Sequence, residues 1–424
     1  MITLAVFFVA LFAGLPIVGV ILVGAITFLA TNDLAALYDS IPIQFYGALV
    51  INSLLAIPLF MLVGEVMNRA GLTQRLVAVA EVLVGGLKGG LAYANLATNA
   101  MAAAILGSAV AQIGVMSKVM IPEMERKGYD RAFSGAVTVS AGLLGPIIPP
   151  SMLMIIYGVV AVQPIAPLFI AGLVPGLLIV VALAVVIFVV GVVKGLPSGV
   201  GHDVGPKAKV LVEGLAPALI PVVVIVGIMA GVMTPTESGA VASIIALVLG
   251  FAYRELKLRD LAPIFLAVAL STATITGLIA AASVLSWALA FQGVPDLLVE
   301  FMAGLTQSPT AFLLLVVVML VVLGMFLESI SVLIVVVPLL MPVVVGLGID
   351  PIHFGVVCTV ATVVGLVTPP VGPGLYIAMV AADIRMGALF RATLPFLLVV
   401  FACIALIAAV PALSTWLPQA TLGR

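Results

Sequence analysis

The stretch Gly142–Tyr157 is apolar enough to lie in a membrane, yet it contains Pro146, Pro149 and Pro150. Proline removes a backbone donor and clashes with the preceding turn, so a helix cannot run unbroken through this stretch. In hydrocarbon, the freed backbone groups must be buried in protein or line a wet cavity. The stretch therefore predicts a broken membrane helix.

A second stretch, Gly365–Tyr376, repeats this pattern and again carries a Pro-Pro pair, Pro369-Pro370. Two Pro/Gly-interrupted spans at matching places in two halves of a chain indicate the binding site of a secondary transporter. The alternative is a pair of simple proline kinks, which are common in membrane helices. The matching place of both stretches in a longer repeat favours the transporter.

The composition fits a membrane protein. The chain has 424 residues, of which 64% are hydrophobic and 8% charged, with a mean hydropathy of +1.43. No soluble core needs that much apolar surface, so we expect an all-α polytopic membrane protein. The net charge of −1 does not indicate a nucleic-acid partner. Cys358 and Cys403 both lie in apolar segments, which argues against a disulfide framework or a metal cluster.

The apolar runs predict nine membrane spans. They cover about residues 2–30, 45–68, 132–159, 168–192, 210–232, 236–252, 261–290, 352–382 and 392–415. The first run is too long for a signal peptide core and lacks a basic start, so we expect it to be retained. Two further stretches, 90–124 and 311–347, are each too long for one span and carry glycine or polar residues near the middle.

The basic residues predict which side each connection occupies. Lys and Arg cluster at 69–75, 126–131, 194–209, 254–259 and 385–391, whereas 31–44, 160–167, 292–310 and 346–351 have none. If the basic set is cytoplasmic, the nine spans alternate only when 90–124 and 311–347 are re-entrant hairpins. This scheme predicts a cytoplasmic N-terminus and an outer C-terminus. Residues 72–87 and 294–306 are expected to lie as amphipathic helices at the two interfaces.

An internal repeat supports this arrangement. Gly71 matches Gly293, Gly128-Tyr-Asp130 matches Gly348-Ile-Asp350, and Gly142 matches Gly365, all at shifts of 220 to 223 residues. We expect a first repeat over 1–193, a loop and linking helix over 194–232, and a second repeat over 233–424. The linking helix reverses the second half, which predicts an inverted-topology repeat. Gly71 and Gly293 begin the surface helices and are candidate hinges.

The hairpin tips are expected at Gly107-Ser108 and Glu328-Ser329, close to the two breaks. Tips and breaks expose carbonyls and hydroxyls, which suit a small hard cation such as Na⁺, and half-helix N-termini suit a carboxylate. The candidate ligands of two or more Na⁺ ions are Gly107, Ser108, Gly145, Ile148, Pro149, Glu328, Ser329, Thr368 and Val371. The candidate substrate contacts are Ser108, Pro150, Ser151, Ser329, Gly372 and Pro373. No organic cofactor is expected.

Several of these residues have a second interpretation. Ser108 could bond back to its own helix. Glu328 is a carboxylate in an apolar run, which is costly and usually functional, but it could be a structural hydrogen-bond acceptor or a proton carrier. Glu65 and Asn68 lie near a span end and are expected to be interfacial, and His353 is expected to be structural.

Several motifs together resemble the large membrane subunit of tripartite ATP-independent periplasmic (TRAP) transporters, in the ion-transporter superfamily. They are Ile121-Pro-Glu-Met, Gly128-Tyr-Asp, Gly145-Pro-Ile-Ile-Pro-Pro-Ser151, Leu168-Phe-Ile-Ala-Gly-Leu-Val-Pro-Gly176, Thr234-Pro-Thr-Glu237, Gly348-Ile-Asp-Pro351 and Gly365-Leu-Val-Thr-Pro-Pro-Val-Gly372. The resemblance covers nearly the whole chain. The family often has an Asp near the second tip, where this chain has Glu328.

The resemblance implies a Na⁺-driven symporter in the bacterial inner membrane that imports an organic-acid anion, such as a C4-dicarboxylate or sialic acid, by an elevator motion. It also implies a periplasmic substrate-binding protein and a small membrane subunit of about four helices as a separate chain. The alternatives are a stand-alone Na⁺- or H⁺-coupled dicarboxylate carrier and, more distantly, an intramembrane enzyme. The sequence has no His-Glu-x-x-His motif and no Gly-x-x-x-x-Gly-Lys-Ser/Thr motif, so we expect a secondary transporter and not an enzyme or an ATPase.

Overall fold

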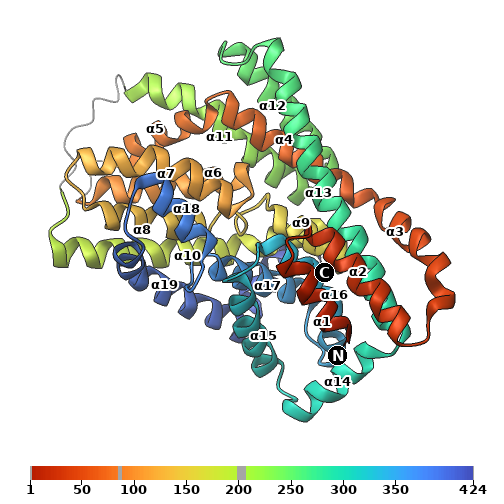
Figure 1. Ribbon diagram of the computed structural model, residues 1–424. Coiled ribbons are helices and arrows are strands. Elements are labelled where there is room, and N and C mark those ends of the chain that lie inside the picture. Colours follow the sequence, from red (N-terminus) through yellow and green to blue (C-terminus); the bar gives the residue numbers. More distant parts are fainter. Residues whose placement is uncertain (1, 85–87, 198–206, 424) are drawn as a thin grey trace.

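The computed structural model describes residues 2–84, 88–197 and 207–423, and helices dominate these residues (Figure 1). Six of the described helices are long and apolar enough to cross a membrane, or up to seven if one bent pair counts as a span. The prediction of an all-helical polytopic membrane protein is confirmed at this level.

The first repeat consists of α4 (Ala56–Arg69), the surface helix α5 (Leu72–Val84), the helical hairpin α6 (Gly90–Leu106) and α7 (Ala109–Arg126), the broken helix α8 (Arg131–Gly142) and α9 (Met152–Val160), and α10 (Ile165–Lys194). The second repeat consists of α13 (Leu258–Phe291), α14 (Val294–Leu305), α15 (Pro309–Gly324) and α16 (Ser329–Gly346), α17 (Pro351–Gly365) and α18 (Pro373–Ala382), and α19 (Met386–Ala409). Between the repeats lie α11 (Lys207–Met229) and α12 (Pro235–Ala252). The expected surface helix reaches residue 87, but 85–87 lie outside the described residues.

The N-terminal run 2–30 is not the single span that its hydropathy predicts. It forms two packed helices, α1 (Ile2–Phe12) and α2 (Ile17–Thr31), separated where Gly14 has a φ of 80° and Pro16 cannot donate a backbone bond. The hydroxyls of Thr3 and Thr31 are 3.3 Å apart, so the run turns back on itself. The start of the chain therefore lies beside Thr31, whereas a single span over 2–30 would place the two at opposite ends. Which side of the membrane the N-terminus occupies stays a prediction.

Two other expected spans are also interrupted. The span expected over 45–68 is split into α3 (Ile41–Leu49) and a second part that begins with the short helix η2 (Asn52–Leu55), and the two parts are bent by 55°. The span expected over 392–415 ends at Ala409, because Pro411 opens a separate helix, α20 (Ala412–Leu422). The broken spans 132–159 and 352–382 are interrupted where the prolines predict.

The helices form two bodies. In one, α2, α3 and α4 pack on α13, and α11 and α4 pack on α12. In the other, each hairpin packs on both broken helices, since α7 contacts α8 and α18 while α15 contacts α17 and α16 contacts α9. The long helices α10 and α19 join this second body, since α19 contacts α8 and α10 contacts α9 and α17. We call the first body the scaffold and the second the hairpin body.

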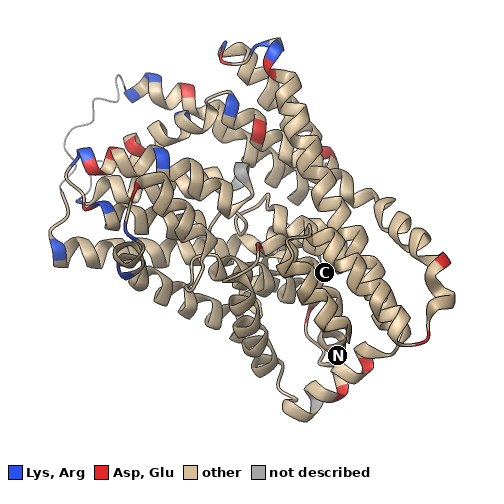
Figure 2. Cartoon of the chain, in the orientation of Figure 1, with Lys and Arg blue, Asp and Glu red and all other residues tan. Residues whose placement is uncertain are grey.

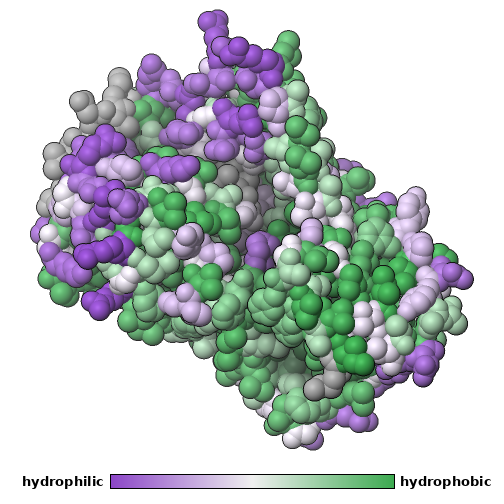
Figure 3. Space-filling model, in the orientation of Figure 1, coloured by the Kyte–Doolittle hydropathy of each residue, from purple (hydrophilic) through white to green (hydrophobic). Residues whose placement is uncertain are grey.

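Charge marks opposite edges of the molecule. Lys and Arg lie along the upper and left edge in Figure 2, near α5, α7 and the loop before α13, whereas α14 and the turn after α2 at the lower right carry acidic residues. Between these edges the surface is largely hydrophobic (Figure 3). The surface helices α5 and α14 lie at the two opposite edges, as an inverted repeat requires (Figure 1).

The surface helix α5 is attached to the scaffold by a charged cluster around Arg75. The Arg75 guanidinium is 3.0 Å from a carboxylate oxygen of Glu213 and 3.4 Å from one of Glu255, and it lies 4.2 Å from the centre of the Tyr253 ring. The candidate hinges Gly71 and Gly293 have φ values of 63° and 69°, which favour glycine. That they act as hinges stays a prediction.

Candidate functional site

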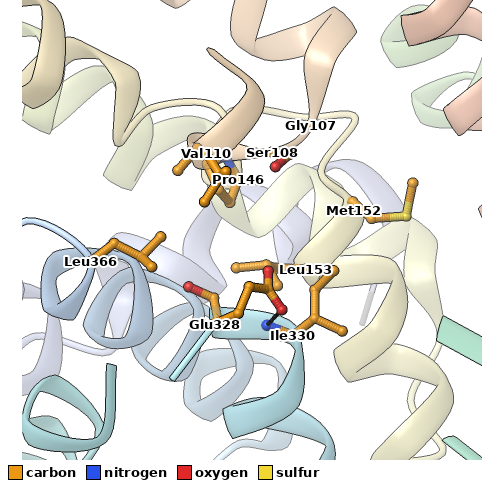
Figure 4. A pocket seen from close by; sticks show the side chains of 11 residues that line it. Gly107, Ser108, Val110, Pro146, Met152, Leu153, Glu328, Ile330 and Leu366 are labelled. Carbon is orange, nitrogen blue, oxygen red and sulfur yellow. Dashed lines mark hydrogen bonds between the residues drawn. The ribbon is translucent and has the colours of Figure 1, made fainter. Parts of the chain in front are cut away.

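The two hairpin tips lie where the sequence predicts them, and the structure brings them to one pocket. The α6–α7 turn falls at Gly107-Ser108, and α16 begins at Ser329 directly after Glu328. Gly107, Ser108, Glu328 and Ser329 line one pocket together with Pro146 from the first break (Figure 4). Residues more than 200 positions apart in the sequence therefore face the same space.

Helix N-termini surround this pocket. Ser108, Ser151 and Glu328 are the N-cap residues of α7, α9 and α16, and each side chain accepts a backbone N–H bond from its own first turn. The Glu328 carboxylate accepts from Ile330 at 3.0 Å (Figure 4). The ends of these helices carry partial positive charge, which favours anions nearby.

The first tip packs directly on the first break. A Cβ placed on Gly107 would lie 3.4 Å from the Met152 nitrogen, and one on Gly145 would lie 2.6 Å from Gln112 Oε1 and 3.4 Å from the Ser108 carbonyl carbon. The buried Ser151 hydroxyl donates to the Pro146 carbonyl and accepts from the Met154 N–H at 3.2 Å. The Ser151 hydroxyl therefore makes both of these hydrogen bonds within the break, and Ser151 does not line the pocket.

The second tip is bonded to the second break. The Gly372 N–H donates to the Met325 carbonyl at 3.2 Å, and the Ser329 hydroxyl donates to the Thr362 carbonyl at 3.4 Å. The Thr368 hydroxyl donates to the Val364 carbonyl of α17 at 2.8 Å. Thr368, Val371, Gly372 and Pro373 lie in or next to the break, and the pocket between the two tips is lined by other residues.

A larger cavity of about 450 Å³ joins the tips to the scaffold. Ser108, Met152 and Glu328 line one wall, while α4 and α13 supply the other wall with Gly64, Glu65, Asn68, Ser271 and Thr274. Glu65 and Asn68, expected from their place near a span end to be interfacial, thus line the cavity opposite the hairpin tips. Glu65 is paired with Arg69 at 2.8 Å.

The contribution of α13 to this cavity was not predicted from the sequence. Ser271 and Thr274 are small hydroxyl residues in a long apolar helix, and their spacing of three places them on one face. That spacing is the only signal that could have found them. His353, expected to be structural, bonds through Nδ1 to the Ser414 hydroxyl at 3.2 Å.

The chain matches a family model over residues 4–413, described as the DctM component of the tripartite ATP-independent periplasmic transporter. A sialic acid TRAP transporter large permease protein, SiaM, of Vibrio cholerae is 34% identical over 97% of both chains. A C4-dicarboxylate TRAP transporter large permease protein, DctM, of Pseudomonas aeruginosa is 34% identical over 90% of this chain and 89% of that one.

Two further similarities extend this picture. The isethionate TRAP transporter permease protein DctMQ of Oleidesulfovibrio alaskensis is 32% identical over 88% of this chain, but the match covers only 60% of that longer protein. Among solved structures, the YdaH transporter of Alcanivorax borkumensis has a similar fold, with a TM-score of 0.66 and 15% identity over 91% of this chain and 90% of that one.

Proposed function

The chain belongs to the DctM component family of tripartite ATP-independent periplasmic transporters, and we propose that it couples the import of a small organic-acid anion to Na⁺. It is a multi-pass inner-membrane permease subunit and not an enzyme. The observation that carries the proposal is the 450 Å³ cavity in which both hairpin tips face α4 and α13. A substrate in this cavity would touch both bodies of the molecule.

The donor set suits Na⁺. Within the described residues, no group of three or more His, Cys, Asp or Glu side chains could hold a metal ion. The carbonyl oxygens of Gly145, Ile148 and Pro149 in the first break, and those of Thr368 and Val371 in the second, accept no hydrogen bond from the described residues. Hard cations take such oxygen ligands, so we infer that Na⁺ binds between each break and the facing tip.

The substrate would be held without a basic side chain. The described lining of the cavity contains no Lys or Arg, and Glu65 is already paired with Arg69. A carboxylate would therefore meet the N–H groups that begin α7, α9 and α16, together with bound Na⁺. The relatives are named for sialic acid, C4-dicarboxylate and isethionate, which supports an organic anion of this size range as the substrate.

Two partners follow from the family. We propose that a periplasmic binding protein delivers the substrate and that a small membrane subunit of about four helices packs on the scaffold as a separate chain. The isethionate permease DctMQ is longer than this chain, as expected if the small subunit is fused there and separate here.

For the orientation, we propose that the edge rich in Lys and Arg is cytoplasmic. Gly89 and Tyr129, at the two ends of the first hairpin, both donate to the Pro197 carbonyl, so this hairpin enters and leaves at the cytoplasmic side as a re-entrant pair. The second hairpin would open outward beside α14. Both termini then lie outside, because Thr3 neighbours Thr31, and α20 lines a cavity with Gln163 and Asp350.

The two-body packing supports an elevator motion in which the hairpin body slides against the scaffold. Phe60 of α4 and Phe169 of α10 touch across the boundary, with ring centres 5.9 Å apart. Cysteines at these two positions, in a chain whose Cys358 and Cys403 have been replaced, should be joined by a short bifunctional reagent. The crosslink should stop uptake, and a cleavable reagent should restore it. Full uptake by the crosslinked protein would rule out sliding at this boundary.

Reconstitution tests the function as a whole. The chain, its small subunit and the binding protein with its identified ligand are placed in proteoliposomes, and uptake is measured under a Na⁺ gradient, a proton gradient or neither. We expect uptake only with the binding protein and an inward Na⁺ gradient. Uptake without the binding protein would indicate a stand-alone carrier, and uptake driven only by a proton gradient would overturn Na⁺ coupling.

A further inference from the structure

A row of four buried polar side chains crosses the first hairpin toward the first break. Asn95 Nδ2 donates to the Thr138 hydroxyl at 2.7 Å, and Asn99 Nδ2 donates to Asn95 Oδ1 at 2.7 Å. Gln112 Nε2 then donates to Asn99 Oδ1 at 2.9 Å and to the Asn99 carbonyl at 2.7 Å. All four side chains are fully buried.

The direction of this row is fixed at one end. The Thr138 hydroxyl donates its only proton to the Ser134 carbonyl at 2.8 Å, so it can only accept from Asn95. Asn95 must therefore point its NH₂ group at Thr138 and its oxygen at Asn99. Asn99 must then donate its NH₂ group to the Asn95 oxygen and present its own oxygen to the Gln112 NH₂ group. The Gln112 oxygen must therefore face away from the row.

That oxygen lies at the first break without a partner. Gln112 Oε1 is buried and accepts no hydrogen bond from the described residues. It lies beside Gly145, where an added Cβ would approach it to 2.6 Å. A buried amide oxygen without a donor is costly, so something else must satisfy it.

We propose that Gln112 Oε1 is a side-chain ligand of the Na⁺ ion bound between the first tip and the first break. This inference rests on the proposed Na⁺ coupling and adds a residue to it. A cation fits because the amide can present only its oxygen here, beside Gly145, whose carbonyl accepts no hydrogen bond from the described residues. Thr138 is a positioning residue, since it acts on the ion only by orienting the amides between them.

The test measures Na⁺ binding at each break separately, on the purified full-length chain. Hydrogen–deuterium exchange of peptides covering 143–151 and 366–372 is followed as NaCl replaces choline chloride. In the wild type, Na⁺ should slow exchange at both breaks. In Gln112→Met, the half-saturating Na⁺ concentration at 143–151 should rise about ten- to hundredfold, a loss typical of disturbed metal coordination. The response at 366–372 should persist.

Matched variants separate ion binding from folding. Ser117→Ala removes a buried hydroxyl of α7 that has no partner among the described residues, and it should leave both responses unchanged. Thr138→Val removes the hydroxyl that fixes the orientation of the amides, so it should weaken the response at 143–151. Thr138→Ser keeps that hydroxyl and should keep the response. This second pair decides the matter if Gln112→Met does not fold.

The outcomes distinguish this inference from the proposal on which it rests. An unchanged half-saturating concentration at 143–151 in Gln112→Met, or in Thr138→Val where that pair decides, would overturn the role of Gln112 while leaving Na⁺ coupling intact. A wild type that responds equally to Na⁺ and choline at both breaks would overturn Na⁺ binding itself, and the role of Gln112 with it.

Discussion

The two hairpins follow one backbone plan, but different interactions attach them to their broken helices. The first hairpin is joined to α8 by the amide row that ends on Thr138. The second is joined to α17 by close contact between glycines, since a Cβ on Gly365 would lie 2.6 Å from the Gly324 Cα. The two halves therefore share their helix arrangement but not the side chains that hold it together. Among the described residues, only the first half has buried side-chain amides that could face an ion.

The largest expected effect concerns the glycine contact of the second hairpin. Gly365→Ala places a methyl group against the Gly324 Cα and 2.7 Å from the Val321 carbonyl, both of which are backbone atoms that move only with their helix. We expect the free energy of unfolding to fall by about 3 kcal/mol, at the upper end for overpacking. Thermal unfolding in detergent measures it.

Gly387→Ala in α19 is the matched control, because no atom lies within 4 Å of its added Cβ. A helical glycine in open space should gain about 0.5 kcal/mol or more as alanine. Equal melting temperatures for the two variants would show that the α15–α17 contact is looser than described.

The amide row of the first hairpin should give a smaller effect. Asn99→Leu leaves the Asn95 side-chain oxygen without its donor and removes one of the two acceptors of the Gln112 NH₂ group, which keeps the Asn99 carbonyl. The loss should be about 1–2 kcal/mol, because buried polar contacts in membranes are worth less than in water-soluble cores. Hydrogen–deuterium exchange should increase over 90–126 and stay constant over 309–346. Thr98→Val, a neighbouring buried hydroxyl without a partner among the described residues, should change neither.

Glycine and proline residues predict the tips and breaks, because each affects the backbone within one helical turn of its own position. Ser108, Pro146 and Glu328 were therefore placed correctly from the sequence. The amide row was missed because Asn95 and Thr138 are 43 residues apart, and only the fold brings them together. The N-terminal hairpin was missed because hydropathy averages over Gly14 and Pro16, whose effect is on direction and not on polarity.

Composition also does not predict which helices, distant in the sequence, contact each other. The helices α10 and α19 carry no break like those of α8–α9 and α17–α18, yet they pack with the hairpin body. Likewise, the place of Glu65 near a span end does not predict that it lines the cavity, because the facing residues Ser108 and Glu328 are distant in the sequence.

The tips also differ in charge, since Ser108 caps one and Glu328 the other. Glu328→Gln keeps an oxygen that can accept from Ile330, so stability should hold, but it removes a full charge from the cavity. We expect the Na⁺ concentration for half-maximal uptake to rise about tenfold, as for a disturbed metal ligand. If Glu328 instead carries a proton, Glu328→Gln will keep its Na⁺ dependence and lose the pH dependence of uptake. Glu328→Asp, which keeps the charge, is the control.

The smallest effects are expected from the two hydroxyls that the sequence assigned to Na⁺. The Ser108 oxygen accepts from Ala111 at 3.5 Å, a long contact, so Ser108→Ala should cost only about 0.5 kcal/mol as a lost helix cap. The Thr368 hydroxyl is held by Val364 at 2.8 Å, which leaves its lone pairs for an ion. Ser108→Ala and Thr368→Val should each raise the half-maximal Na⁺ concentration by less than Glu328→Gln does, because a neutral ligand is lost and the carbonyls remain. Ser108→Thr and Thr368→Ser, which keep the hydroxyl, should behave as wild type. If Thr368→Val and Thr368→Ser have the same Na⁺ dependence while Ser108→Ala and Ser108→Thr differ, a hydroxyl binds Na⁺ only at the first tip, and the asymmetry between the hairpins extends to the ions.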